Sequence, residues 1–238
     1  MEYVIYLTDN CNLNCNYCYQ NKEKKDIKFE YIKNLIDYEI KQKNKYSIID
    51  FYGGEPLLKK DLIKATINYI KSSKTKTKFY YGITTNGTLL DDDFIKYMKK
   101  NNFINIGYSF DGMKKTHDLN RLTIDGKETF DIVFNNSKKI INKFPRVVAT
   151  LVICKNTLEN LAENVEFLYK IGFKNINLLF NYFQNWTDKD LPEIKKQYNN
   201  IAQIYANKIL AYKDFNISLI DDKIQSYIRE DYKCNENC

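Results

Sequence analysis

Three cysteines of the chain, Cys11, Cys15 and Cys18, fall within eight residues, with three and then two residues between them. Three thiolates this close together can hold a metal ion or an iron–sulfur cluster. A [4Fe–4S] cube has four irons, so three thiolates leave one iron open for a small molecule. The alternatives are a zinc site, although the single histidine, His117, is far away in the sequence, and three unrelated cysteines.

The cysteines must be positioned by the element before them, a short aliphatic and aromatic run from Tyr3 to Leu7 that predicts a strand. Similar apolar runs predict strands over 46–52, 79–84, 103–110, 146–154 and 174–180. Between them, apolar residues at helical spacing predict helices over 29–40, 58–72, 91–101, 128–144 and from Asn156 or Thr157 to Ile171, with Gly172 as the stop. This alternation predicts a parallel sheet with crossover helices.

Further motifs follow directly after predicted strands. They are Gly53-Gly54-Glu55-Pro56, Thr84-Thr85-Asn86-Gly87 and Tyr108-Ser109-Phe110-Asp111-Gly112. Enzymes with barrels of parallel strands keep their active sites at the carboxyl ends of these strands, so the cysteines and the motifs are expected at one site. A carboxylate such as Glu55 accepts hydrogen bonds from an ammonium group, and a hydroxyl such as Ser109 bonds a ribose or a carboxylate. An ordinary turn is the alternative for each motif.

The cysteine spacing, with the aromatic Tyr17 before the last thiol, resembles the radical S-adenosylmethionine (radical SAM) enzymes. The motif at Gly53 resembles the GGEP segment of that family. The segment from Ser109 to Arg121 resembles the S-x-D-G and H-x-x-x-R region of members that modify peptides or proteins, such as sulfatase maturases. The resemblance covers about residues 2–181 and implies an α/β fold, a partial (β/α)6 barrel.

The resemblance implies that Cys11, Cys15 and Cys18 hold a [4Fe–4S] cluster whose open iron chelates SAM. It implies that Glu55 contacts the amino group of SAM and Arg121 its carboxylate. The full implied set of SAM-binding residues is Tyr17, Gly53, Gly54, Glu55, Thr85, Asn86, Ser109, Arg121 and Leu179. For His117 and Asp111 we expect structural roles, and for Cys154 that of a small buried apolar residue.

In this family an electron, here expected from a flavodoxin or ferredoxin, cleaves SAM to methionine and a 5′-deoxyadenosyl radical that takes hydrogen from the substrate. The motifs favour a peptide or protein substrate. A small metabolite or RNA is the alternative within the same fold, and a non-catalytic iron–sulfur or zinc protein is the alternative outside it.

The chain is predicted to consist of a barrel over residues 1–184 and a short, mainly helical extension over 185–238. Helices over 191–212 and 223–230 and a short strand over 215–220 are predicted there. The extension ends in Cys234 and Cys238, which resemble the start of an auxiliary cluster site but supply two of the usual four ligands. No peptide-recognition domain is expected before residue 3.

The net charge of +7 does not predict a nucleic-acid partner, because only three of the 37 basic residues are arginines and the lysines are spread along the helices. Dispersed lysines are typical of a solvated surface. No run approaches the roughly 18 apolar residues of a membrane span, and nothing resembles a signal peptide. We therefore expect a cytoplasmic protein, in which clustered thiols bind metal rather than form disulfides.

Overall fold

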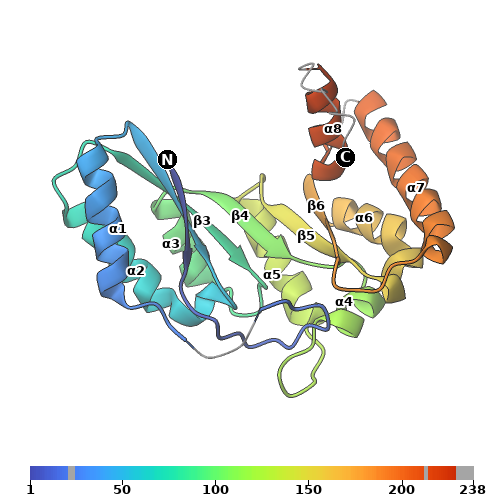
Figure 1. Cartoon of the computed structure of the whole chain (residues 1–238), viewed down its shortest axis with the longest axis horizontal. Helices are drawn as coiled ribbons and strands as arrows, with labels where there is room; N and C mark the ends of the chain where they lie inside the picture. Colours follow the sequence, from blue (N-terminus) through green and yellow to red (C-terminus); the bar gives the residue numbers. More distant parts are fainter. Residues whose placement is uncertain (21–24, 212–213, 229–238) are drawn as a thin grey trace.

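The computed structural model of the protein describes residues 1–20, 25–211 and 214–228. Within them, a sheet of seven parallel strands lies at the centre, with the strands adjacent in chain order (Figure 1). They are β1 (Glu2–Tyr6), β2 (Tyr46–Tyr52), β3 (Lys78–Thr85), β4 (Phe103–Ser109), β5 (Val148–Ile153), β6 (Asn175–Phe180) and the short β7 (Asn216–Ile217). The predicted α/β fold with a mainly helical C-terminal part is confirmed.

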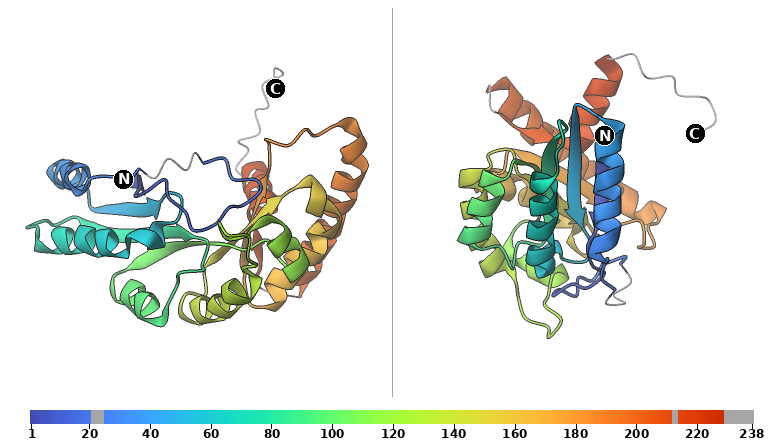
Figure 2. Two further views of the ribbon diagram at one scale, coloured as in Figure 1. Left: turned by 90° about the horizontal axis from the view of Figure 1, so that it is seen from below. Right: turned by 90° about the vertical axis from the view of Figure 1, so that its left-hand side faces the viewer.

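Helices connect the strands and cover one side of the sheet. They are α1 (Phe29–Gln42), α2 (Lys60–Ser72), α3 (Asp92–Lys100), α4 (Lys114–Asn120), α5 (Phe130–Lys143) and α6 (Leu161–Lys170), followed by α7 (Leu191–Leu210) and α8 (Ser218–Ile228). The 3₁₀ turns are η1 (Pro56–Lys59), η2 (Lys155–Asn160) and η3 (Asp188–Asp190). Figure 2 shows the helices on the convex side of the curved sheet and the segment after β1 crossing its open side.

The hydrophobic core lies between the convex face of the sheet and these helices. Along β2, Ile49 and Phe51 are buried while the residues between them are only partly buried, and β5 repeats the same two-residue period. On the helix side, Ile32 and Ile36 of α1 supply buried partners. Because successive strand residues point to opposite faces, the other half of each strand lines the concave face.

The structure departs from two local predictions. Residues 155–160 form the 3₁₀ turn η2 before α6, and the Thr157 hydroxyl donates to the Cys154 carbonyl at 3.3 Å, so the predicted helix cap at this position was wrong. The strand predicted over 215–220 stops at Ile217, because α8 begins at Ser218. The Asp221 carboxylate accepts the Ile217 N–H at 2.7 Å and so stabilises that helix start.

Two further points concern helices. The helix α4 was not predicted, because its seven residues are too few to show a period. Gly172 follows α6 with a φ of +115°, as expected for a helix stop. No helix in the described part of the chain combines the length and the apolar character that crossing a bilayer requires.

Candidate active site

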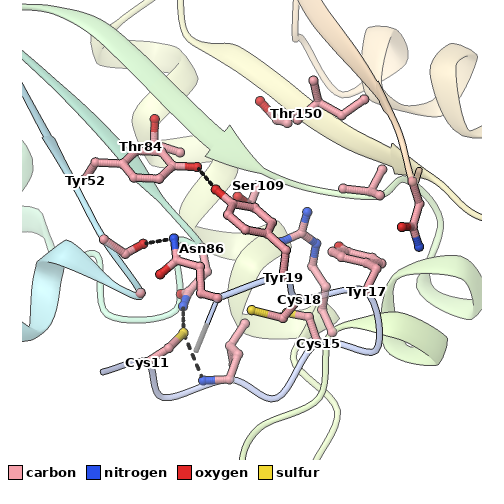
Figure 3. Close-up of a pocket in the computed structure, with 18 of the residues that line it drawn as sticks. Cys11, Cys15, Tyr17, Cys18, Tyr19, Tyr52, Thr84, Asn86, Ser109 and Thr150 are labelled. Atoms are coloured by element: carbon pink, nitrogen blue, oxygen red, sulfur yellow. Dashed lines mark hydrogen bonds between the residues drawn. The ribbon is translucent and has the colours of Figure 1, made fainter. Parts of the chain in front are cut away.

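The three cysteines of the first motif line one cavity of about 390 Å³ at the carboxyl end of the sheet (Figure 3). This cavity has the size of a small-molecule site. Residues at the carboxyl ends of β2 to β6 and in the loops that follow these strands complete it. Of the predicted SAM-binding residues, those that line it are Tyr17, Gly53, Gly54, Thr85, Asn86, Ser109, Arg121 and Leu179.

The cysteine loop is held against the loop after β2 by two backbone hydrogen bonds. The Gly54 N–H donates to the Thr8 carbonyl at 2.8 Å, and the Glu55 N–H donates to the Asn10 carbonyl at 2.9 Å. A Cβ atom on Gly54 would lie 2.3 Å from the Asn10 oxygen, so any other residue there would force the two loops apart. Gly54 is therefore required by the close approach of two backbones.

Hydrogen-bond donors reach one of the thiols. The Cys11 sulfur accepts the Leu13 N–H at 3.4 Å and the Asn86 side-chain amide at 3.7 Å. Burial raises the pKa of Cys15 to about 11, although the Arg121 guanidinium opposes the shift. Because iron binds the thiolate, filling the site must release this proton.

The donor set fits an iron–sulfur cluster. Among residues 1–20, 25–211 and 214–228, no three His, Cys, Asp or Glu side chains form a group that one metal ion could hold. In a cube, each thiolate takes an iron of its own. Three thiols placed around one cavity, with N–H groups directed at a sulfur, match that requirement. The second pair, Cys234 and Cys238, lies outside the described residues.

Glu55 differs from the sequence-based expectation, because its carboxylate does not line the cavity. The side chain is fully buried and accepts three hydrogen bonds, from the Leu57 N–H at 2.9 Å, the Thr85 hydroxyl at 2.8 Å and the Asn86 N–H at 2.7 Å. Burial raises the pKa of Glu55 to about 7 against these donors. The carboxylate thus orients the end of β3 and the loop that follows it, which carry the lining residues Thr85 and Asn86.

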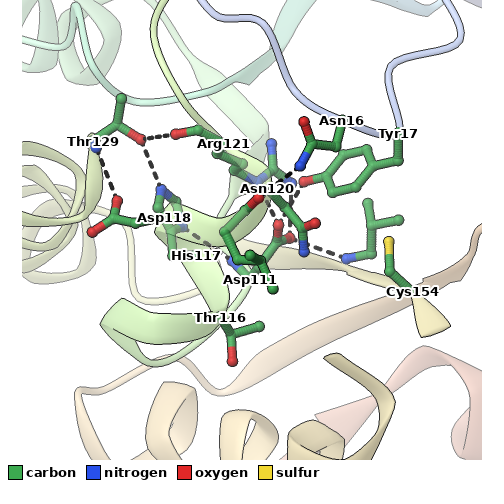
Figure 4. A network of polar contacts seen from close by, with 12 residues as sticks. Asn16, Tyr17, Asp111, Thr116, His117, Asp118, Asn120, Arg121, Thr129 and Cys154 are labelled. Carbon is green, nitrogen blue, oxygen red and sulfur yellow. Dashed lines mark hydrogen bonds and ion pairs between the residues drawn. The ribbon is translucent and has the colours of Figure 1, made fainter. Parts of the chain in front are cut away.

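Asp111 has a structural role, as expected, and the structure shows that Arg121 and Tyr17 are its partners (Figure 4). Its carboxylate is fully buried and accepts hydrogen bonds from both Nε and Nη2 of Arg121, each at 3.0 Å. The Tyr17 hydroxyl donates to the same carboxylate at 2.6 Å, and the Val152 N–H donates at 3.1 Å. The planar fork of Arg121, expected at a SAM carboxylate, is therefore held by a residue of the protein.

The same network orients Tyr17 over the guanidinium. The Arg121 Cζ lies 5.2 Å from the centroid of the Tyr17 ring, within the range of a cation–π contact. Arg121 and Tyr17 come from segments about a hundred residues apart in the sequence, and Asp111 joins them. The signal that could have indicated this was a single acidic residue directly after β4, followed by one of the few arginines.

His117 has the structural role expected of it. Its ring is fully buried, with Nδ1 accepting the Asp111 N–H at 3.4 Å and Nε2 lying 3.1 Å from the Thr129 hydroxyl. That hydroxyl donates to the Arg121 carbonyl at 2.5 Å, so it accepts from Nε2. Burial lowers the pKa of His117 to about 3. The neutral imidazole therefore links Asp111, which precedes α4, to Thr129, which precedes α5.

Aromatic side chains that the sequence did not single out form the rim of the cavity. Tyr19 and Phe183 are stacked with their ring centroids 6.4 Å apart, and the Tyr19 and Tyr52 hydroxyls lie 3.3 Å from each other. Cys154 lies apart from the three clustered thiols and is buried, as expected, with the Asn181 amide 3.7 Å from its sulfur.

Known proteins resemble this chain in sequence and in structure. The chain is 35% identical over 176 residues to an uncharacterised protein of Methanocaldococcus jannaschii, covering 73% of the chain and 60% of that protein. It is 32% identical over 178 residues to a cysteine-type anaerobic sulfatase-maturating enzyme of Clostridium novyi, covering 70% and 47%. The chain thus spans about half the length of these curated relatives.

A solved structure of the same fold is that of native anSMEcpe with bound AdoMet and a peptide named Kp18Cys. It superposes with a TM-score of 0.84 at 22% identity and covers 96% of this chain and 66% of its own. The family model of the radical SAM superfamily matches residues 5–168. Over residues 5–168, which run from β1 into the last turn of α6, the chain therefore belongs to the radical SAM superfamily, whose members use a [4Fe–4S] cluster and SAM.

Proposed function

We propose that the chain is a radical SAM enzyme that binds a [4Fe–4S] cluster through Cys11, Cys15 and Cys18 and modifies a side chain of a peptide or protein. The observation that carries this proposal is the single cavity that these thiols share with the glycine, asparagine and serine motifs. When bound, the cluster and SAM supply reductive cleavage and a radical that abstracts hydrogen. The chain itself binds, orients and shields these groups.

Individual residues take distinct parts in this proposal. Asp111 holds Nε and Nη2 of Arg121, which leaves Nη1 to meet the carboxylate of SAM. Gly53 and Gly54 bring backbone groups to the cavity without side chains in the way. Glu55 acts as a positioning residue, because its hydrogen bonds fix Thr85 and Asn86 at the cavity wall.

The relatives support a peptide or protein substrate. Besides the sulfatase-maturating enzyme, the chain is 28% identical over 242 residues to a radical SAM cyclopropyl synthase of Paramaledivibacter caminithermalis. The fold is also that of SuiB of Streptococcus suis, solved with its precursor peptide SuiA (TM-score 0.63, 19% identity). An acidic electron donor such as a flavodoxin or ferredoxin would be attracted by the net charge of +7.

The test is release of 5′-deoxyadenosine from SAM after anaerobic reconstitution and reduction with dithionite. Wild type should release it and hold about four irons per chain. The triple variant Cys11→Ala, Cys15→Ala, Cys18→Ala should lose both, whereas the matched control Cys154→Ala, outside the cavity, should keep the iron. Release at the wild-type rate by the triple variant would refute the proposal.

The same measurement of iron content tests the role of the C-terminal cysteines, Cys234 and Cys238. We propose one cluster per chain, with Cys234 and Cys238 as a partial site. Iron that the triple variant retains, and that is lost when both tail cysteines are also changed to Ala, would instead show a second cluster.

A further inference from the structure

A further hollow lies on the concave face of the sheet and has a volume of about 790 Å³. It is lined mainly by residues of β2 to β6, among them Asp50, Asn105 and Asn177, together with Ile83, Ile104 and Ile106. Thr84 and Thr150 line both this hollow and the cavity of the cysteines, so the two spaces adjoin. A ligand in the hollow would therefore reach the cysteine cavity between these two threonines.

The strand register explains why this space is open. The inward-facing residues fall into three rows across the sheet: Asp50–Gly82–Asn105, Thr84–Gly107–Val148–Asn175 and Ser109–Thr150–Asn177. In a closed barrel of eight strands, such layers are filled by bulky branched side chains. Here the rows consist mainly of glycine, threonine, serine and asparagine, which are too small or too polar to form an apolar core. The concave face is therefore built as a polar hollow.

Two glycines on the strands of the hollow make room for side chains of neighbouring strands. A Cβ atom on Gly82 would lie 1.4 Å from the Asp50 Oδ1, so the Asp50 carboxylate lies across Gly82 toward Asn105. A Cβ atom on Gly107 would lie 2.8 Å from the Thr84 hydroxyl oxygen. Side chains of neighbouring strands thus occupy the space over both glycines, and only glycine at these positions leaves room for them.

The chemistry of the lining indicates what the hollow can bind. Asn105, Asn175 and Asn177 line it, and each side-chain amide offers the same donors and acceptor that a peptide group needs. The Ser218 hydroxyl donates to the Asn177 Oδ1 at 2.8 Å, which orients that amide. Asp50 and Arg146 add an acidic and a basic group to the lining, and burial raises the pKa of Asp50 to about 7. An extended peptide, with its alternating N–H and C=O groups, matches such a surface.

We propose that this hollow, which we call the polar groove, binds the main chain of the substrate segment next to the residue that enters the cysteine cavity. The inference rests on the proposed function and deepens it. Asn105 on β4 and Asn177 on β6 recognise peptide groups from two sides of the groove. The groove recognises the peptide backbone, and the side chain to be modified passes Thr84 and Thr150.

The probe for this proposal is acetyl-Gly-Gly-Ser-Gly-Gly-amide, titrated calorimetrically into the anaerobically reconstituted full chain with SAM. Its matched control replaces the four glycines by N-methylglycine, which lacks the N–H donors. Wild type should bind the unmodified probe at least tenfold more tightly. Asn105→Leu and Asn177→Leu should each weaken binding of the unmodified probe about threefold to tenfold. Asn199→Leu, exposed on α7, should leave it unchanged.

Equal affinity of wild type for the two probes would overturn the proposal, and this comparison does not depend on whether any variant folds. Unchanged affinity in both leucine variants would overturn it as well. Release of 5′-deoxyadenosine is measured in the same wild-type preparation. SAM cleavage without discrimination between the probes refutes the polar groove alone, and discrimination without SAM cleavage refutes the proposed function alone.

Discussion

Replacing Gly53 by Ala should displace the cysteine loop. Gly53 has a φ of +139°, and a Cβ atom on it would lie 2.4 Å from the Thr8 carbonyl oxygen and 3.2 Å from the Thr8 nitrogen. Both are backbone atoms, so no side chain can rotate away to relieve the overlap. The backbone at Thr8, three residues before Cys11, would have to move.

The cost of this substitution has two parts. A residue other than glycine at positive φ costs about 1–2 kcal/mol, and overpacking costs about 1–3 kcal/mol more. Gly126 is the matched control, because it also has a positive φ, +79°, but nothing lies within 4 Å of its added Cβ atom. Gly126→Ala should therefore cost only the first part. The free energy of unfolding of Gly53→Ala should therefore be lower than that of Gly126→Ala by about 1–3 kcal/mol, which is the cost of overpacking.

Urea unfolding of both variants measures this difference, and iron content after anaerobic reconstitution measures its effect on the site. We expect Gly53→Ala to lose iron and Gly126→Ala to retain it. Equal stability of the two variants, with full iron in both, would show that the contact of Gly53 with Thr8 does not hold the cysteine loop in place.

Three further predictions concern the buried polar groups. Asp111→Ala leaves Arg121 as an unpaired buried charge, so in urea titrations it should lower the free energy of unfolding by about 3–5 kcal/mol. Arg121→Lys should weaken SAM binding in equilibrium dialysis, because one ammonium group cannot reproduce the planar fork of the guanidinium. Wild-type stability of the first variant and wild-type SAM affinity of the second would contradict the network. Glu55→Ala removes the acceptor of two N–H groups and a hydroxyl and should lower the free energy of unfolding by about 2–4 kcal/mol. The SAM affinity should also fall because Asn86 moves, and hydrogen exchange of the Asn86 amide would detect that movement. Unaltered exchange at Asn86 would rule out the positioning role of Glu55. His117 should make the free energy of unfolding depend on pH, because burial lowers its pKa to about 3 in the folded chain from about 6.5 in the unfolded chain. As the pH falls, the unfolded state therefore binds the proton first. The contribution of His117 to stability is complete above pH 6.5, and below that pH stability falls by up to about 1.4 kcal/mol per pH unit. As His117 is the single histidine, its NMR titration is unambiguous, and a midpoint near 6.5 would disprove its burial.

Local patterns in the sequence were sufficient to predict most of the strands and helices and to indicate three cysteines as candidate cluster ligands. Strands such as 46–52 were predicted to the residue, because alternation of buried and partly buried side chains is a property of consecutive residues. The cysteine spacing is equally local, since three thiolates on one short loop can reach one cluster whatever the rest of the chain does. The alternation of strands and helices then led to the parallel sheet.

Tertiary structure alone decided the partners of the charged groups and the character of the concave face. The ion pair of Arg121 with Asp111 and the hydrogen bonds of Glu55 to Thr85 and Asn86 depend on how loops from different strands meet. The polar groove depends on register, because Gly82 lies between Asp50 and Asn105 only when three strands are aligned. Such pairings join residues tens of positions apart, and burial decides them by excluding water from some polar groups and not from others.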